Sequence, residues 1–289
     1  MHALISRTTA SRTPLYAAGL TVMAAAALTA CGTSTGGSSA APASPLAAVR
    51  LAAQTSNGAT SFTGTMSLRA TATGGGTGSG STSLTASFAE QLKPSLRAQV
   101  DVQSLSAAGS SLPGGMTEVL TPSTLYMKWS YLTTQLHLTK PWLDIPLSSV
   151  SKSSGINLSQ IFSEASSSSP LTESQLLGGA TAVRKVGTGT VGGVAVTEYT
   201  GKLSLTKGLQ YLSASNRSAV QKAFKTAGIS TATFTVWIAG KNTVRKAIIS
   251  ENGTTVSETV TTTITSINQP VHVTVPAASQ TTALPSGNL

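Results

Sequence analysis

Cysteine, histidine, aromatic residues and charge are all scarce in this chain. One cysteine occurs in 289 residues, so no disulfide can form within the chain and no pair of thiols can hold a metal. Three histidines and nine acidic residues leave few groups for catalysis, and aromatic residues make up only 4% of the sequence. These shortages exclude a disulfide-stapled domain and disfavour a metalloenzyme or a Ser-His-Asp hydrolase.

The remaining reactive groups are spread too thinly to form a catalytic motif. His137 and His272 are the only histidines beyond residue 30, and they lie far apart in the sequence. Two Ser-x-x-Lys tetrads occur, at 149–152 and 204–207, but the other two motifs of penicillin-binding enzymes are missing and serine is abundant enough to produce both by chance. We therefore expect a non-catalytic protein that needs no cofactor and no metal.

The first thirty residues have the pattern of a secretion signal. Arg7 and Arg12 precede an uncharged apolar run over 15–30, which ends in the sequence Leu-Thr-Ala-Cys-Gly. An aliphatic residue and two small residues before Cys31 match the bacterial lipobox. A transmembrane anchor is the alternative, but a membrane span needs about 20 apolar residues and this run is shorter. We expect residues 1–30 to be removed before Cys31.

Cys31 is then the first residue of the mature chain and the expected site of acylation. A single acyl chain holds a protein only marginally, whereas the diacylglycerol that a lipobox cysteine receives anchors it stably. Residues 32–45 are almost entirely Gly, Ser, Thr, Ala and Pro, which is typical of a flexible tether. The sequence thus predicts an acylated cysteine and tether over 31–45 and a single domain over 46–289, on the extracytoplasmic face of the cell membrane.

The formal net charge of +10 is dispersed along the chain. A basic protein outside the cytoplasm is suited to an anionic lipid surface or to acidic cell-wall polymers. Nucleic acid is not an expected partner, because the charges do not cluster and the chain is exported. The expected partners are the membrane, a lipid or glycolipid ligand and an envelope export protein.

Alternating apolar and polar residues predict a large antiparallel sheet. From Phe62 onward even positions are mostly apolar and odd positions polar, and the alternation continues through segments around 84–92, 96–102, 118–120 and 125–129. The end of the chain alternates again, with Asn252-Gly253 predicting a type I′ turn before strands at 256–267 and 271–275. The glycine pair at 192–193 predicts a hairpin over 183–205.

Helical spacing occurs between these groups of strands. Short helices are predicted over 45–56, 156–165 and 170–177, and a longer one between 207 and 227 that Gly228 ends. About ten strands and four helices define an α+β protein. A wide sheet with one apolar face must curl and be covered, so the helices are expected to lie over its concave face.

Several segments, in this order, resemble actinobacterial lipoproteins of the LppX and LprG type, whose half-barrel is similar to that of the LolA and LolB lipoprotein carriers. The resemblance spans nearly the whole mature domain. It is carried by the lipobox and by six further segments, namely Lys140–Asp144, Val186–Gly187, Gly192–Val194, Glu198–Gly201, Val236–Ile238 and Val244–Lys246. It implies a non-catalytic carrier that holds acyl chains of lipids or glycolipids inside a half-barrel and helps to move them across the cell envelope. No catalytic residue follows from it, and the low aromatic content and long Ser/Gly loops depart from the pattern of that family.

A carrier of this kind would use the apolar side of its strands as a cavity wall. The same side chains can equally fill a closed core, because cavity wall and core are chemically alike. Lys241, Arg245 and Lys246 are the candidates to meet anionic head groups, or they form an ordinary solvated hairpin. The candidate lining residues are Phe62, Met66, Leu68, Phe88, Val100, Met127, Trp129, Phe234, Val236 and Ile238.

Two other functions fit the same sequence. An envelope scaffold or adhesin would have a closed core and bind protein or polysaccharide on its outer surface. A secreted sensor or inhibitor of a surface enzyme is the third interpretation. An elongated apolar void that opens at a rim would favour the carrier, and a filled interior would favour the scaffold.

Overall fold

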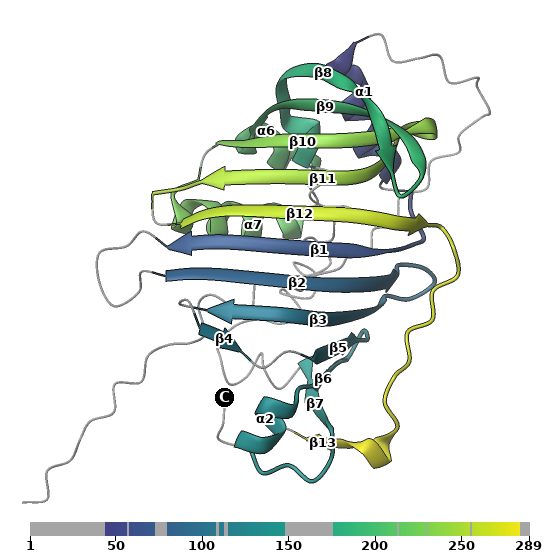
Figure 1. Cartoon of the computed structure of the whole chain (residues 1–289), viewed down its shortest axis with the longest axis vertical. Helices are drawn as coiled ribbons and strands as arrows, with labels where there is room; N and C mark the ends of the chain where they lie inside the picture. Colours follow the sequence, from purple (N-terminus) through teal and green to yellow (C-terminus); the bar gives the residue numbers. More distant parts are fainter. Residues whose placement is uncertain are drawn as a thin grey trace, which may run out of the picture.

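One wide, curved sheet organises the chain (Figure 1). The structure is a computed structural model, and it describes residues 44–56, 58–72, 80–107, 110–112, 115–147, 176–212, 214–229, 231–254 and 256–283. The sheet has 13 strands in the order β13-β7-β6-β5-β3-β2-β1-β12-β11-β10-β9-β8, and β4 pairs with β3 outside this path. The N-terminal strand β1 therefore lies in the middle of the sheet, next to β12 from near the other end of the chain.

The strands form where residues alternate or where β-branched residues gather, as the sequence predicts. All neighbouring pairs are antiparallel except β13 with β7, which are parallel. The predicted large, curved antiparallel sheet is therefore confirmed, with one parallel pair at this edge. The strands are β1 (Ser61–Ala72), β2 (Gly80–Gln91), β3 (Arg97–Ala107), β4 (Ser110–Leu112), β5 (Met116–Leu120), β6 (Thr124–Lys128), β7 (Trp142–Pro146), β8 (Ala180–Val191), β9 (Val194–Ser204), β10 (Thr231–Ala239), β11 (Thr243–Asn252), β12 (Val256–Ile267) and β13 (Thr281–Ala283).

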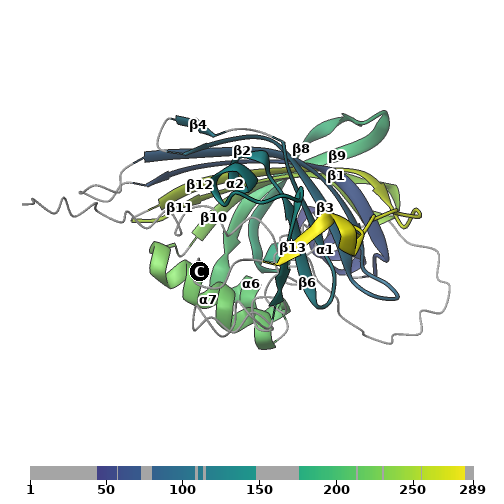
Figure 2. The ribbon, with the colours of Figure 1, turned by 90° about the horizontal axis from the view of Figure 1, so that it is seen from below.

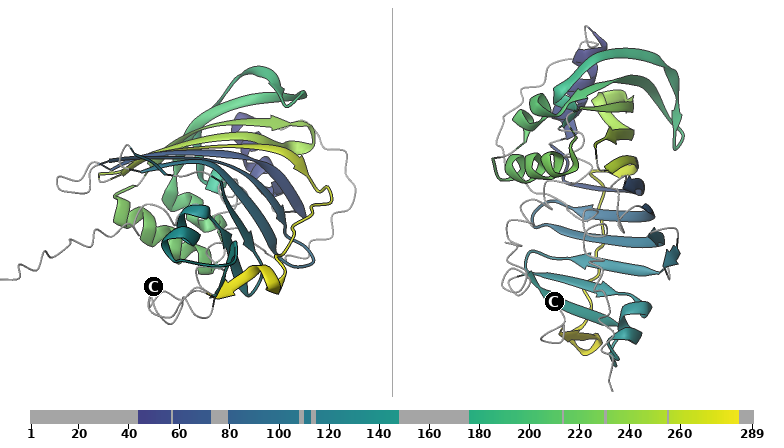
Figure 3. Two further views of the ribbon diagram at one scale, coloured as in Figure 1. Left: turned by 60° about the horizontal axis from the view of Figure 1, so that its bottom comes forward. Right: turned by 90° about the vertical axis from the view of Figure 1, so that its left-hand side faces the viewer.

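Helices α1 (Pro45–Ser56), α6 (Leu205–Gly208) and α7 (Ala214–Ala227) lie beneath the sheet on its concave side, which we call the inner face (Figures 2 and 3). Helix α1 packs its buried residues Val49, Ala52 and Ala53 into the same core as strand β10. The helices are α1 (Pro45–Ser56), α2 (Ser130–Gln135), α6 (Leu205–Gly208) and α7 (Ala214–Ala227), and the 3₁₀ turns are η1 (Leu177–Gly179), η2 (Leu209–Tyr211), η3 (Gly240–Asn242) and η4 (Ala278–Gln280).

Two predicted chain reversals are confirmed. Gly192 and Gly193 join β8 to β9 with φ values of 56° and 77°, a conformation that glycine adopts without strain. Gly228 ends α7 with φ of 66°, and the amide of Ile229 reaches back to the carbonyl of Phe224 at 2.8 Å, as in a Schellman cap.

Two other predictions near the C-terminal end are wrong. Asn252 ends β11 and Gly253 donates to the carbonyl of Val256, but neither residue has a positive φ, so the turn is not type I′. Thr254 in this turn lies against Gly228 at the end of α7, and that tertiary contact replaces the tight turn. Residues 271–275 form no strand, since prolines at 270 and 276 flank them and cannot donate to a neighbour.

Some predicted elements fall outside the described residues. These are the signal peptide, Cys31 and most of the tether, the glycine-rich loop over 73–79, the helix predicted over 156–165 and most of the helix predicted over 170–177. The last two residues of that helix, Leu176 and Leu177, are buried at η1.

A bulge in the middle of the sheet depends on one glycine. The register of β1 against β12 shifts between Thr63 and Gly64. A methyl group at Gly64 would lie 2.2 Å from the carbonyl oxygen of Thr263 and 2.6 Å from the ring of Phe88. Glycine at this position therefore lets the Phe88 ring lie across β1 at the bulge.

Replacing Gly64 with alanine is expected to lower the free energy of unfolding by about 2 kcal/mol, because backbone and ring must both move. Thermal denaturation of Gly64→Ala measures the loss. Gly189→Ala on the exposed part of β8 is the matched control, since nothing lies within 4 Å of the added methyl group. Equal melting temperatures for the two variants would contradict the account of the bulge.

Candidate functional site

The inner face of the sheet is a continuous apolar surface. Opposed residues of neighbouring strands point to the same side, so Leu84, Leu68, Val260, Ile249 and Phe234 form one row across β2, β1, β12, β11 and β10. The next row in one direction is Ala86, Met66, Thr262, Ala247 and Val236, and the next row in the other is Thr82, Ala70, Glu258, Glu251 and Ala232. The inner face is therefore mostly apolar across five strands, with a few polar residues among the apolar ones.

The outer face is polar, and hydroxyl groups outnumber the charged residues on it, such as Lys246 and Glu198. Hydroxyl groups from neighbouring strands bond to each other there, as Thr63 does with Ser266 at 2.7 Å and Ser83 does with Ser106 at 2.9 Å. Serine and threonine are thus abundant because they solvate one face of a long sheet while suiting the strand conformation.

Buried apolar residues of the inner face separate into two cores. The first, the helix-covered core, joins α1, η1, α6 and η2 to strands β8 to β11 and is centred on Val49, Leu177, Leu203, Phe234 and Val236. The second, the strand-only core, is built from β1, β2, β3, β5, β12 and the segments beside them, and is centred on Phe62, Phe88, Ala98, Val100 and Leu120. Within the described residues, no helix contributes a side chain to the strand-only core.

Nine of the ten candidate lining residues point to the inner face. Their role in binding stays a prediction. Those of the strand-only half are Phe62, Met66, Leu68, Phe88, Val100 and Met127. Those of the helix-covered core are Phe234, Val236 and Ile238.

Trp129 is the tenth and lies apart from the rest. It precedes α2, half-buried, with its ring 5.1 Å from that of Tyr131. Helix α2 has no buried residue, so this aromatic pair belongs to the margin of the sheet.

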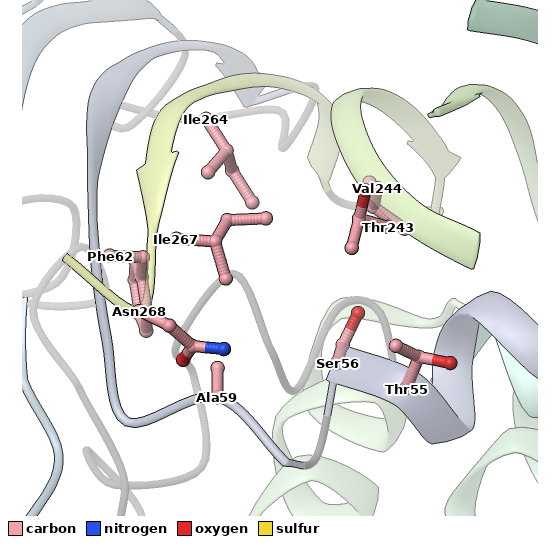
Figure 4. A pocket seen from close by; sticks show the side chains of 9 residues that line it. All are labelled: Thr55, Ser56, Ala59, Phe62, Thr243, Val244, Ile264, Ile267 and Asn268. Atoms are coloured by element: carbon pink, nitrogen blue, oxygen red, sulfur yellow. The ribbon is translucent and has the colours of Figure 1, made fainter. Parts of the chain in front are cut away.

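A pocket of about 50 Å³ lies where the two cores meet (Figure 4). Ligand pockets for small molecules usually measure roughly 300–1,000 Å³, so this one is too small for an acyl chain. This pocket by itself therefore cannot hold an acyl chain. The pocket is lined by Thr55, Ser56, Ala59, Phe62, Thr243, Val244, Ile264, Ile267 and Asn268.

Acidic residues occupy positions on this dry face, which the sequence analysis missed. Glu90 and Glu118 are 5% and 7% exposed, and burial raises the pKa of Glu90 to about 8 and that of Glu118 to about 7. Glu251 and Glu258 face each other on β11 and β12, where burial and the neighbouring Glu258 raise the pKa of Glu251 to about 7. The signal for Glu90 was its position in the alternation of β2. Glu90 follows Leu84, Ala86 and Phe88 at every second residue, so it points to the same face as they do.

The predicted basic residues do not gather on the inner face. Lys246 pairs with Trp237 across β11 and β10, and its ammonium group lies 4.7 Å from the Trp237 ring centre on the outer face. Arg245 donates to the carbonyl of Thr265 at 3.1 Å. Of the two interpretations given for these basic residues, the position of Lys246 fits the ordinary solvated hairpin, because residue 246 points to the face opposite to that of Ala247.

The Ser-x-x-Lys tetrad at 204–207 lies where a strand passes into a helix. Ser204 ends β9 and Lys207 lies in α6. Among the described residues, no group of three or more His, Cys, Asp and Glu side chains could hold a metal ion. No helix in the described part of the chain is long and apolar enough to cross a membrane.

An open, curved sheet with helices over its concave apolar face is a half-barrel. The lipoprotein LprF from Mycobacterium bovis has this fold, with a TM-score of 0.52 and 11% identity over 81% of this chain and 97% of that one. The lipoprotein LppX from Mycobacterium tuberculosis aligns over 80% of this chain and 98% of its own at 20% identity, with a TM-score of 0.45. The predicted resemblance is confirmed at the level of the fold.

Comparison of the sequence alone gives no further information. No model of a protein family and no curated protein matches it.

The raised pKa of Glu90 makes stability depend on pH. Between the ordinary pKa of 4.5 and about 8, the folded chain keeps a proton that the unfolded chain has released, so the free energy of unfolding falls as pH rises through this range. Chemical denaturation at pH 4 and pH 8 measures how much the free energy of unfolding falls between these pH values. We expect this fall to be smaller in Glu90→Gln, by on the order of a few kcal/mol, because glutamine does not titrate. If the free energy of unfolding fell equally with pH in the variant and in the original chain, this assignment would be refuted. The measurement at pH 4 is the internal control, because Glu90 is mostly protonated there in both the folded and the unfolded chain.

Proposed function

We propose that this protein is a surface lipoprotein that binds acyl chains of a lipid or glycolipid against the inner face of its half-barrel and carries them within the cell envelope. No reaction is involved. The ligand would transfer from a membrane to a protein surface that is equally apolar, and each methylene group kept from water contributes about 0.8 kcal/mol.

One observation carries this proposal. The strand-only core is built from strands and the segments that flank them. The row from Leu84 to Phe234 continues from this core into the helix-covered core, on which α1 and η1 pack. Because no helix among the described residues packs on this part of the sheet, its side chains can receive an acyl chain without displacing a described helix. The fold shared with the lipoprotein LprF supports the same interpretation.

The deep burial of the apolar side chains fits a second candidate, an envelope scaffold with a closed core that binds protein or polysaccharide. Buried residues such as Phe62 and Val100, which are 1% and 3% exposed, fit a filled interior as well as a cavity wall. The two candidates differ in what a bulky side chain on the inner face would do.

Ala86 and Ala89 allow that comparison, because they lie on opposite faces of β2. Ala86 is 1% exposed on the inner face beside Met66, whereas Ala89 is half-buried on the outer face beside Thr63. We expect Ala86→Trp to fold and to lose most of its bound lipid, since an indole occupies the space of an acyl chain, and Ala89→Trp to keep it.

Native mass spectrometry with lipid extraction, on residues 32–289 made without the anchor, measures the occupancy, and thermal denaturation checks folding. Stoichiometric lipid on the original chain supports the carrier. A lipid-free original chain together with an unfolded Ala86→Trp would overturn it in favour of the scaffold.

The proposed anchor is Cys31, which acyl chains would hold to the outer side of the cell membrane after residues 1–30 are removed. Cys31→Ser is expected to abolish incorporation of an alkyne fatty acid and to move most of the protein from the membrane fraction to the medium. Ser34→Ala, three residues on in the tether, serves as the control and should change neither readout. Membrane retention of Cys31→Ser would refute acylation as the anchor. An envelope export partner stays a prediction.

A further inference from the structure

Two carboxylic acids lie on the inner face on either side of β3. Glu90 of β2 is opposite Ala98, and Glu118 of β5 is opposite Val100, so both point to the same side of the sheet. Two strand spacings and an offset of two residues separate their backbones by about 12 Å. The side chain of Ala98 next to Glu90 is small, so it fills little of the space beside that carboxyl group.

Glu90 has an unsatisfied atom. Its Oε2 is fully buried and has no hydrogen-bond partner. An unpaired buried polar atom destabilises the folded state, so folded proteins retain few of them. An apolar residue at this position would avoid that cost, so the carboxyl group is better explained by a group that reaches it from outside the described chain.

The surroundings of Glu90 decide which chemistry suits that group. Burial is the cause that raises the pKa of Glu90, without a contribution from a neighbouring cation. The group is therefore a neutral carboxylic acid, which both donates and accepts a hydrogen bond. A hydroxyl group matches it in both directions. A phosphate would be buried without a counter-charge, and an ammonium group would require a buried ion pair whose desolvation is costly.

We propose that Glu90 is the hydrogen-bonding anchor for an uncharged hydroxyl group of the bound lipid, so that the preferred cargo is a neutral hydroxylated lipid of the diacylglycerol type. This inference rests on the proposed function, because it assumes that acyl chains lie on the inner face. It adds the class of head group that goes with them.

The neighbours of Glu90 fit a polar group held between acyl chains. Phe62 is directly opposite Glu90 on β1, and its ring packs against that of Phe88 at 5.8 Å. Phe62 also lines the pocket at the junction of the two cores (Figure 4). The carboxyl group thus lies beside a wall of aromatic side chains, where the glyceryl end of a lipid would have apolar contacts for its chains and one polar contact for its hydroxyl.

Three probes with the same acyl chains test the inference by competition against a fluorescent fatty-acyl ligand on residues 32–289. They are dioleoylglycerol, its 3-O-methyl ether and dioleoyl phosphatidic acid. A hydrogen bond to a buried group contributes about 1.4 kcal/mol, so dioleoylglycerol is expected to bind about tenfold more tightly than the ether. Phosphatidic acid is expected to bind more weakly than dioleoylglycerol by at least that factor.

Variants assign the preference to Glu90. Glu90→Leu is expected to bind the diacylglycerol and the ether equally and to fold at least as stably, because it removes an unpaired buried atom. Glu90→Gln keeps a donor and an acceptor and should keep the preference within about threefold. Glu198→Gln, opposite Trp237 on the outer face, is the control and should behave as the original chain.

The outcomes separate this inference from the proposed function. If no probe binds the original chain, the carrier proposal fails, and this inference fails with it. If all three probes bind but Glu90→Leu keeps the tenfold preference, only the inference about Glu90 is overturned. The same holds if phosphatidic acid is the tightest ligand.

Discussion

A common phase of side chains across the sheet is the constraint on which the molecule depends. Successive residues of a strand point to opposite faces, so a slip of one residue in any pair would turn a row of valine, leucine and phenylalanine toward water. The bulge at Gly64 and the shifts in β2, β8 and β10 absorb local irregularities while keeping that phase. Because every strand keeps it, residues from β2 and β10, more than 140 positions apart, form one apolar surface.

This phase also explains which parts of the fold could be predicted. Alternation is a local signal, so strands such as β1 and β3 and the hairpin at Gly192 follow from the sequence. The pairing of β1 with β12 does not, because it is a contact between distant segments. The same reason accounts for the errors at Asn252 and at 271–275, where a contact with α7 and two flanking prolines outweigh local preference.

The candidate site was predicted only in its apolar part. Phe62, Met66 and Phe88 are apolar residues in the right phase, so their common face follows from the periodicity. Glu90 and Glu118 point to the same face. The sequence does not predict their burial, because a carboxylate among alternating apolar residues is expected to turn toward water. Lys246 illustrates the converse, since its neighbour Ala247 points inward and Lys246 itself stacks on Trp237 outside.

The hydroxyl ladder of the outer face has a consequence for the environment the protein tolerates. Charged surfaces attract a cloud of counter-ions, and their repulsion and solubility change as salt screens them over about 10 Å at 0.1 M. Hydroxyl groups paired as Thr63 with Ser266 and Ser250 with Thr259 bind water through neutral dipoles instead. These paired hydroxyl groups therefore hold water on the outer face at any ionic strength, whereas the charges beside them, such as those of Lys246 and Glu198, are screened as salt rises.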